Sequence, residues 1–236
     1  PTVIKATAIS ENTAFANMAS QLDLCDIRDL ALRFGIHRAD GTELLYYPSS
    51  VLGVNEIAPM SVAGAMAGIA NNGVYCSTIV LDHVLIRATQ ESLQVPTSNC
   101  SQAVSADVAH GMTYAMHTVI TGGTGGASST GDGAYLAGKT GTTDSGVHTW
   151  MSGFSSTVAT STWVGNVVGT KSLRGTTINK KAAATLRHDI WRTTMKEANK
   201  LYPPAKSMPA PPQSMIDAST VQVPNVAGQT PDAASQ

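Results

Sequence analysis

Residues 138–143 read Gly-Lys-Thr-Gly-Thr-Thr, and this stretch decides how the rest of the chain is interpreted. Its single lysine, Lys139, stands between an apolar run at 135–137 and small residues that carry hydroxyl groups. A cation beside two hydroxyls, here on Thr140 and Thr142, can grip a carboxylate through charge-assisted hydrogen bonds. Gly141 has no side chain, so another backbone can come close. The stretch therefore predicts a strand that binds a carboxylate.

Taken alone, Lys-Thr-Gly is a weak signal, because a solvated strand end explains it equally well. Its companion is the triplet Ser10-Glu11-Asn12. Ser10 and Asn12 are two residues apart, so both side chains can face one cleft in an extended or turn conformation. A serine can relay a proton to a leaving nitrogen, and an asparagine can pair with a substrate amide. The simpler explanation of the triplet is a helix cap.

Composition limits the kinds of protein that the chain can be. Its 236 residues are enough for one well-buried domain with a small appendage. Charged residues make up 13% and the formal net charge is -1, which argues against a nucleic-acid partner or a charged membrane surface. No apolar run reaches the roughly 20 residues that cross a bilayer, and Pro1 opens no signal-like sequence.

The three cysteines are Cys25, Cys76 and Cys100, and they form no Cys-x-x-Cys pair. We therefore expect no metal, and the chemistry considered below needs no organic cofactor. In an extracytoplasmic protein Cys76 and Cys100 could close a loop of about 24 residues, worth roughly 3 kcal/mol in the chain-entropy description. Cys25 lies in a helical apolar pattern and is predicted to be a buried free thiol.

Apolar residues that recur at three- and four-residue steps predict several helices. Ser105 and Asn179 are expected N-caps, Pro59 an expected first helical residue, and Gly35 a left-handed helix stop. The predicted helices begin near Asn12, Asp26, Pro59, Ser105 and Asn179.

Three strand candidates, 134–140, 149–155 and 158–168, are separated by turn-length gaps that suit an antiparallel meander. Residues 77–87 and 91–96 predict short strands or an excursion at the domain edge. Residues 122–133 consist almost entirely of Gly, Ser, Thr and Ala, which predicts a flexible surface loop.

The wider context of the lysine stretch resembles the end of the transpeptidase domain of class A, bifunctional penicillin-binding proteins. The similar pieces are 138–144, Trp150 with Gly153-Phe154, 163–165, and upstream 10–15 and 53–73. Lys-Thr-Gly, a Ser-Asp-Asn type triplet and Ser-x-x-Lys form the motif set of penicillin-binding proteins and class A β-lactamases. The resemblance covers about residues 5–200. It implies an α+β fold of the serine β-lactamase and D,D-peptidase type, incomplete in this chain, with a central antiparallel sheet flanked by helices.

The resemblance also implies a role for each matching residue. Ser10 relays a proton, Asn12 binds the amide of the donor peptide, and the backbone N–H of Thr142 contributes to the oxyanion hole. The expected catalytic residues are Ser10, Lys139 and Thr142, and the expected substrate-binding residues are Asn12, Thr140, Gly141 and Thr142.

No lysine of the chain has a serine three residues before it, so Ser-x-x-Lys, which carries the nucleophile of the family, is absent. We expect the attacking serine on a separate upstream segment of the same domain. The expected activity is peptidoglycan D,D-transpeptidation through an acyl-serine. Stem peptides ending in D-Ala-D-Ala and β-lactams are the expected ligands. The expected location is extracytoplasmic, at the cell envelope, with membrane attachment only through an upstream segment.

Two alternatives stay open. One is a D,D-carboxypeptidase or serine β-lactamase on the same fold, and the other is a non-catalytic sensor that binds muropeptides or β-lactams. Neither Glu43 nor Glu56 is followed by the Glu-x-x-Leu-Asn pattern of class A β-lactamases, which argues against rapid β-lactam turnover.

The expected domain organisation is a transpeptidase portion at 1–202, a Pro-rich linker at 203–219, and a segment at 220–236 that resembles the start of a PASTA module. A disordered C-terminus is the alternative for that last segment. His148 is expected to be a solvated turn residue. A Ser-His-Asp triad built on His110, His117 or His188 is not expected.

Overall fold

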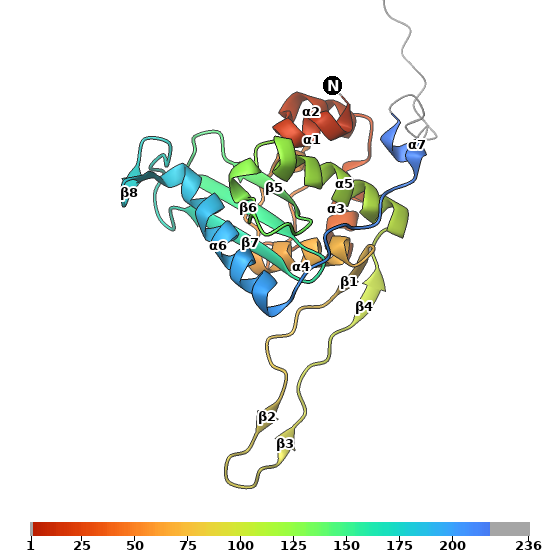
Figure 1. Ribbon diagram of the computed structural model, residues 1–236, viewed down its shortest axis with the longest axis vertical. Coiled ribbons are helices and arrows are strands. Elements are labelled where there is room, and N and C mark those ends of the chain that lie inside the picture. Colours follow the sequence, from red (N-terminus) through yellow and green to blue (C-terminus); the bar gives the residue numbers. More distant parts are fainter. Residues whose placement is uncertain (1, 218–236) are drawn as a thin grey trace, which may run out of the picture.

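The computed structural model describes residues 2–217, and its centre is a three-stranded antiparallel sheet (Figure 1). The strands are β5 (Ala137–Thr142), β6 (His148–Phe154) and β7 (Ala159–Gly165), which are neighbours both in the chain and in the sheet. Short connections join antiparallel strands, as the turn-length gaps of the sequence predict. The predicted meander is confirmed.

The described helices surround this sheet (Figure 1). Their bounds are α1 (Val3–Ile9), α2 (Asn12–Ala19), α3 (Leu24–Arg33), α4 (Pro59–Ala70), α5 (Ala106–Gly122), α6 (Leu186–Leu201) and α7 (Gln213–Ile216), with short 3-10 helices η1 (Pro48–Leu52), η2 (Gly126–Ser128) and η3 (Ala183–Thr185).

Local signals explain several helix ends. The predicted starts at Asn12 and Pro59 are confirmed, and the Ser105 hydroxyl caps α5 by accepting from the backbone N–H of Val108. Gly35 has φ +69°, which confirms the predicted left-handed stop after α3. Asp26 lies in the first turn of α3, as predicted, and the N-cap is Asp23, because its carboxylate accepts from the backbone N–H of the second helical residue.

Each face of the sheet buries its own apolar cluster, because side chains alternate along a strand. Met151 of β6 packs with Trp191 of α6, and both side chains are fully buried. Phe154, three residues further along β6, packs with Ile69 of α4 and Met116 of α5. The α+β fold with a central antiparallel sheet flanked by helices is therefore confirmed.

The predicted N-cap of the last long helix is wrong. Asn179 and Lys180 have φ of 49° and 65° and form the turn between β8 (Thr177–Ile178) and β9 (Lys181–Ala182). Asparagine tolerates left-handed backbone better than most residues, so it suits a tight turn as well as a helix cap. α6 begins only at Leu186, after η3.

The predicted surface loop at 122–133 is confirmed only in part, because most of its residues are exposed but several small ones pack into the domain. Ser128 is fully buried, and Thr130 is 7% exposed. Arg192 of α6 donates from Nη1 to the carbonyl oxygen of Ala127 at 2.7 Å. A Cβ at Gly123 would lie 2.1 Å from the carbonyl oxygen of Ala8. The small residues here allow close packing.

Residues 74–102 form an arm that projects away from the body of the molecule (Figure 1). β1 (Val74–Cys76) pairs with β4 (Cys100–Gln102) at its base, and β2 (Val84–Leu85) pairs with β3 (Ser92–Leu93) further out. A disulfide joins Cys76 to Cys100 at the base. The predicted excursion and the predicted disulfide are both confirmed.

Cys25 is a free cysteine, but it is exposed, so the prediction of a buried thiol is wrong. The half-buried residues of α3 include Leu24, Ile27, Arg28 and Ala31, and Cys25 lies beside this stripe rather than on it.

Residues 203–217 run back over the domain to α7 (Figure 1). Ala205 accepts from the backbone N–H of Tyr135 at 3.2 Å and donates to Ser156 Oγ at 2.8 Å, and Met208 packs against the apolar cluster around Phe154. The linker at 203–219 and the PASTA-like segment at 220–236 stay predictions, since residues 218–236 lie outside the described part. No helix within 2–217 has the length and apolar character needed to cross a bilayer.

Candidate active site

β5, which carries Lys-Thr-Gly, lies at an edge of the sheet and pairs with β6 alone among the described strands. Lys139 is opposite Ser152, and Gly141 is opposite Trp150. An edge strand leaves one row of backbone N–H and C=O groups unpaired, to which an extended peptide can add. β5 therefore offers a free edge along which an extended peptide can pair.

The two sequence motifs meet in space. Lys139 Nζ donates to Ser10 Oγ at 2.6 Å, across 129 positions of the chain, and to the carbonyl oxygen of Thr140 at 3.0 Å. An ammonium can only donate, so Ser10 Oγ is the acceptor and its own proton is free to point elsewhere. A serine held in this way can pass a proton to a neighbouring atom.

Ser10 stands at a sharp corner between α1 and α2. It has φ 59° and ψ 50°, left-handed backbone that costs a serine about 1 to 2 kcal/mol. Asn12 is the exposed first residue of α2, and the N-cap, Glu11, makes no side-chain capping bond. The side chains of Ser10 and Asn12 therefore do not cap the helix as the simpler explanation of the triplet requires, and strained backbone is common where side chains serve a site.

Thr124 ties this corner to β5, and sequence reasoning missed it. Its backbone N–H donates to the carbonyl oxygen of Ala8 at 3.0 Å, near the end of α1. Its hydroxyl is 2.6 Å from the hydroxyl of Thr140, which is buried. The loop after α5 thus fixes the distance between the Ser10 corner and the Lys-Thr-Gly strand.

Arg187, the second residue of α6, is the other residue that sequence reasoning missed. Its Nη1 donates to the carbonyl oxygen of Gly141 at 2.7 Å and to Thr142 Oγ1 at 2.6 Å. Because Thr142 Oγ1 accepts this bond, the exposed hydroxyl keeps its proton for another acceptor. The 45 positions between these side chains explain why no local pattern pointed to the contact.

Two neighbouring cations give the site its electrostatic character. Burial, together with the charge of Arg187, lowers the pKa of Lys139 to about 8, and burial also lowers the pKa of Arg187. Within residues 2–217 no carboxylate forms an ion pair with either side chain. Partly desolvated cations without a counter-charge favour an anion nearby. The arrangement can therefore bind a carboxylate at the β5 edge.

His148 is not the solvated turn residue that we predict from the sequence. It is the first residue of β6, its ring lies 5.7 Å from that of Trp163, and its Nδ1 is buried without a hydrogen-bond partner among the described residues. A Cβ at Gly165 would lie 2.4 Å from that nitrogen, so the opposite strand leaves room only for a glycine.

The histidines of the long helices have their own partners. On α5, His110 Nε2 is 2.9 Å from Asn72 Oδ1, and His117 Nδ1 is 2.7 Å from the carbonyl oxygen of Leu136. On α6, His188 contacts Ser128 and Arg187.

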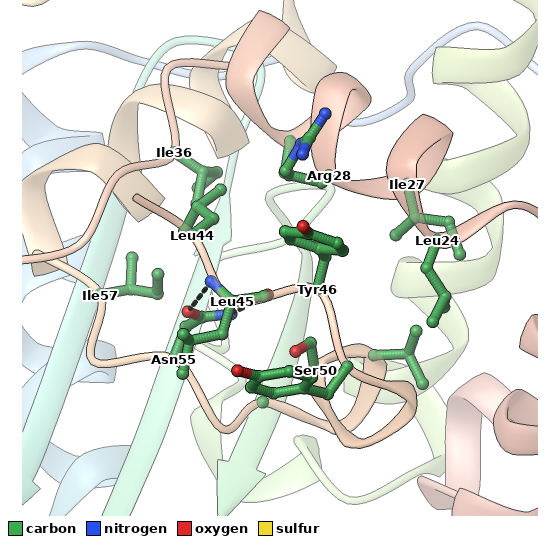
Figure 2. A pocket seen from close by; sticks show the side chains of 14 residues that line it. Leu24, Ile27, Arg28, Ile36, Leu44, Leu45, Tyr46, Ser50, Asn55 and Ile57 are labelled. Carbon is green, nitrogen blue, oxygen red and sulfur yellow. Dashed lines mark hydrogen bonds between the residues drawn. The ribbon is translucent and has the colours of Figure 1, made fainter. Parts of the chain in front are cut away.

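An apolar pocket of about 170 Å³ lies between α3 and residues 44–57 (Figure 2). Asn55 closes one side by bonding both the N–H and the carbonyl oxygen of Leu45, and Arg28 lies over the ring of Tyr46. None of the predicted site residues lines it. The pocket is therefore separate from the candidate site.

An antiparallel sheet between helices, with Lys-Thr-Gly on an edge strand beside a Ser-x-Asn corner, defines a domain of the serine β-lactamase and D,D-peptidase type. Residues 2–192 match the penicillin binding protein transpeptidase domain. The chain belongs to this family, and its relatives indicate the transpeptidase domain of a class A penicillin-binding protein.

Penicillin-binding protein 1A of Aquifex aeolicus is 27% identical over 211 residues, which are 89% of this chain and 27% of that protein. Penicillin-binding protein 1B of Escherichia coli is 30% identical over 166 residues, 69% of this chain and 19% of that protein. The chain therefore spans only about a fifth to a quarter of the length of these relatives.

Among solved structures, PonA1 from Mycobacterium tuberculosis in complex with penicillin V is similar, with a TM-score of 0.74 and 25% identity over 89% of this chain and 59% of that one. Penicillin-binding protein 1A from Haemophilus influenzae has a TM-score of 0.73 and 20% identity over 89% of this chain and 36% of that one. These likenesses establish the fold independently of the motifs.

Proposed function

We propose that the chain forms part of a peptidoglycan D,D-transpeptidase that cross-links stem peptides ending in D-Ala-D-Ala. The nucleophilic serine of Ser-x-x-Lys would come from a separate upstream segment. The observation that carries this proposal is the 2.6 Å hydrogen bond from Lys139 Nζ to Ser10 Oγ, which joins the two motifs into one site. Family membership supports the same chemistry.

In this proposal the donor peptide adds along the free edge of β5 as an extra strand. Its terminal carboxylate lies against Lys139 and the hydroxyls of Thr140 and Thr142, and Gly141 leaves room for its backbone. Asn12 pairs with a peptide amide, using one donor and one acceptor. The carboxylate supplies the negative charge that the two cations of the site lack.

The reaction then runs in two acyl transfers. The upstream serine gives its proton to the lysine of Ser-x-x-Lys as its oxygen attacks the carbonyl carbon of the penultimate D-Ala, and the N–H of Thr142 donates to the oxygen that becomes negative. Ser10, which accepts from Lys139, gives its proton to the departing nitrogen of the last D-Ala and takes the proton held by that upstream lysine, so the C–N bond breaks and the acyl-serine remains. An amine of a neighbouring stem peptide then attacks the acyl-serine and loses a proton to the Ser10 relay, which returns it through the upstream lysine to the serine oxygen as the ester bond breaks.

The proposed location is extracytoplasmic, at the cell envelope, with membrane attachment through an upstream segment. The Cys76–Cys100 disulfide supports it, because disulfides persist in oxidising compartments. We propose β-lactams as ligands of the same site. PonA1, similar in fold, has been solved in complex with penicillin V. We further propose residues 1–202 as the transpeptidase portion, 203–219 as a linker and 220–236 as the start of a PASTA-like module.

The test is labelling of the intact gene product, in envelopes of its source, with a fluorescent penicillin, followed by the mass of every labelled polypeptide. We expect label on a peptide that contains Ser-x-x-Lys. Lys139→Ala should slow labelling by roughly 10²-fold, the usual cost of an electrostatic contact in an acyl-transfer site. Lys200→Ala, on the exposed end of α6 where Lys200 pairs with Glu197, is the matched control and should label normally.

The absence of Ser-x-x-Lys from this chain favours one second candidate, a sensor that binds muropeptides or β-lactams without turning them over. An absence of label from every polypeptide, together with retained binding of a D-Ala-D-Ala peptide, would favour the sensor. Label on residues of this chain would mean that the nucleophile is wrongly placed. Repeated turnover of a chromogenic cephalosporin would favour a β-lactamase, and release of D-Ala without cross-linking a carboxypeptidase.

A further inference from the structure

We propose that Ser128 and His188 are positioning residues, which orient the Arg187 guanidinium and through it the Gly141–Thr142 end of β5. This inference rests on the proposed function in one respect, that the Gly141–Thr142 end of β5 binds substrate. The contacts themselves form a continuous chain of side chains from η2 through α6 to the edge strand.

The hydrogen bonds fix the state of the imidazole. Arg187 Nε donates to His188 Nε2 at 3.1 Å, and a guanidinium can only donate, so Nε2 must carry a lone pair. The neutral ring therefore has its proton on Nδ1, where it donates to Ser128 Oγ at 2.8 Å. Each ring nitrogen has one partner, and the ring cannot rotate without losing both bonds.

The contacts of the Arg187 guanidinium act on β5. With Nε held by His188, the planar guanidinium directs Nη1 at the carbonyl oxygen of Gly141 and at Thr142 Oγ1. Two bonds to adjacent residues hold the strand end at one distance from α6. Arg187 therefore fixes the positions of the hydroxyl and the backbone N–H of Thr142.

This cluster is not a nucleophilic triad. Ser128 is fully buried, so no peptide can reach its hydroxyl. The partner of His188 Nε2 is a cation, not a carboxylate, while the Asp189 carboxylate bonds Lys181 and Arg192. The geometry suits orientation of Arg187 rather than proton abstraction.

Protonation of His188 should break the arrangement, since an N–H at Nε2 would face the N–H of Arg187. Burial, Arg187 and Arg192 lower the pKa of His188, and Asp189 opposes them, so the ring is neutral at neutral pH. Lys181 of β9 reaches this cluster through Asp189. On β5, the nearest charged group to Arg187 is Lys139, whose pKa is lowered by burial and by the charge of Arg187. η2 contributes only the Ser128 hydroxyl and the Ala127 carbonyl, neither of which titrates.

The test uses nuclear magnetic resonance of the whole chain without ligand, so it does not depend on catalysis. In the wild type, we expect the Arg187 Nε–H signal to be protected at pH 7 and lost as His188 is protonated in acid, with the amides of Gly141 and Thr142 shifting at the same midpoint. His188→Gln keeps an acceptor but cannot titrate, so protection should persist and the shared acid step should vanish. His188→Leu should lose protection at every pH. His110→Gln, on α5 and bonded to Asn72, is the matched control.

The proposal is overturned if the acid step persists in His188→Gln, or if the Arg187 signal and both amides are unchanged in His188→Leu. If His188→Leu does not fold, the pH series of His188→Gln decides alone. A parallel titration with N-acetyl-D-Ala-D-Ala separates this inference from the proposed function. Lack of binding to wild type would count against the function, while roughly fivefold to tenfold weaker binding to His188→Leu than to wild type supports the positioning role.

Discussion

Replacing Lys139 by methionine should stabilise the folded chain while removing its carboxylate-binding cation. The ammonium is held partly out of water beside Arg187, and no carboxylate within 2–217 pairs with it. Methionine has a similar length and no charge, so it can occupy the same space without the desolvation penalty. A binding site whose cation has no counter-charge until the ligand binds is expected to lower the stability of the free protein.

The magnitude follows from the pKa. A lysine whose pKa falls from 10.5 to about 8 destabilises the folded state by about 3 kcal/mol at neutral pH, since one pH unit is worth about 1.4 kcal/mol. Partial exposure of the side chain reduces this to about 2 kcal/mol. Loss of the hydrogen bonds to Ser10 and Thr140 offsets part of the gain. We therefore expect Lys139→Met to gain about 1 to 2 kcal/mol and about 2 to 8 °C in Tm.

Urea unfolding at pH 7 and pH 9.5 gives the decisive comparison. Below the folded-state pKa of about 8, Lys139 is protonated in both the folded and the unfolded chain, so its destabilisation of the folded state does not change with pH. Between that pH and 10.5 the unfolded chain holds the extra proton, so the wild type gains stability relative to the variant as the pH rises. The advantage of Lys139→Met should thus shrink at pH 9.5. Lys200→Met, on an exposed site, should change little at either pH. A variant no more stable than wild type at pH 7, or an advantage independent of pH, would refute this reasoning.

Two further predictions concern the scaffold. Replacing both Cys76 and Cys100 by serine should lower the free energy of unfolding by about 3 kcal/mol, because the open chain gains loop entropy; urea unfolding measures this, and Cys25→Ser, at the exposed free cysteine, should leave it unchanged. Gly153→Ala should cost about 3 kcal/mol, because the new Cβ would lie 2.4 Å from the carbonyl oxygen of Ala137. Gly175→Ala, where nothing lies within 4 Å of the new Cβ, is the matched control in thermal unfolding, and equal losses in the two variants would contradict the packing argument.

The elements that the sequence predicts correctly are those whose signal is local. Pro59 and Ser105 mark helix starts through their own backbone and side-chain chemistry, and the meander follows from three apolar strands with short gaps. The wrong expectations concern residues whose surroundings are remote in sequence. Asn179 suits a cap and a turn equally, and only its position before β9 decides between them.

The same distinction holds for the site. Ser10 and Lys139 could be picked out because motifs mark them, and the structure places them in contact. Thr124 and Arg187 carry no motif, since each acts through a contact with β5 that only the packing of α5 and α6 creates. Residues 122–133 are expected from the sequence to form a flexible surface loop because small residues are common in loops, yet a small residue is needed where Gly123 closely approaches the backbone of Ala8 in α1.

The disulfide at the base of the arm also decides how the domain responds to tension. A pull on residues 77–99 passes through the covalent bond between Cys76 and Cys100, so the paired residues of β1 and β4 are not peeled apart. The strain is delivered to the end of α4 and the start of α5, which share one apolar cluster under the sheet. A protease cut anywhere within the arm would leave both ends fastened to the body. The arm can therefore be stretched, bound or severed while the β5 edge keeps its shape.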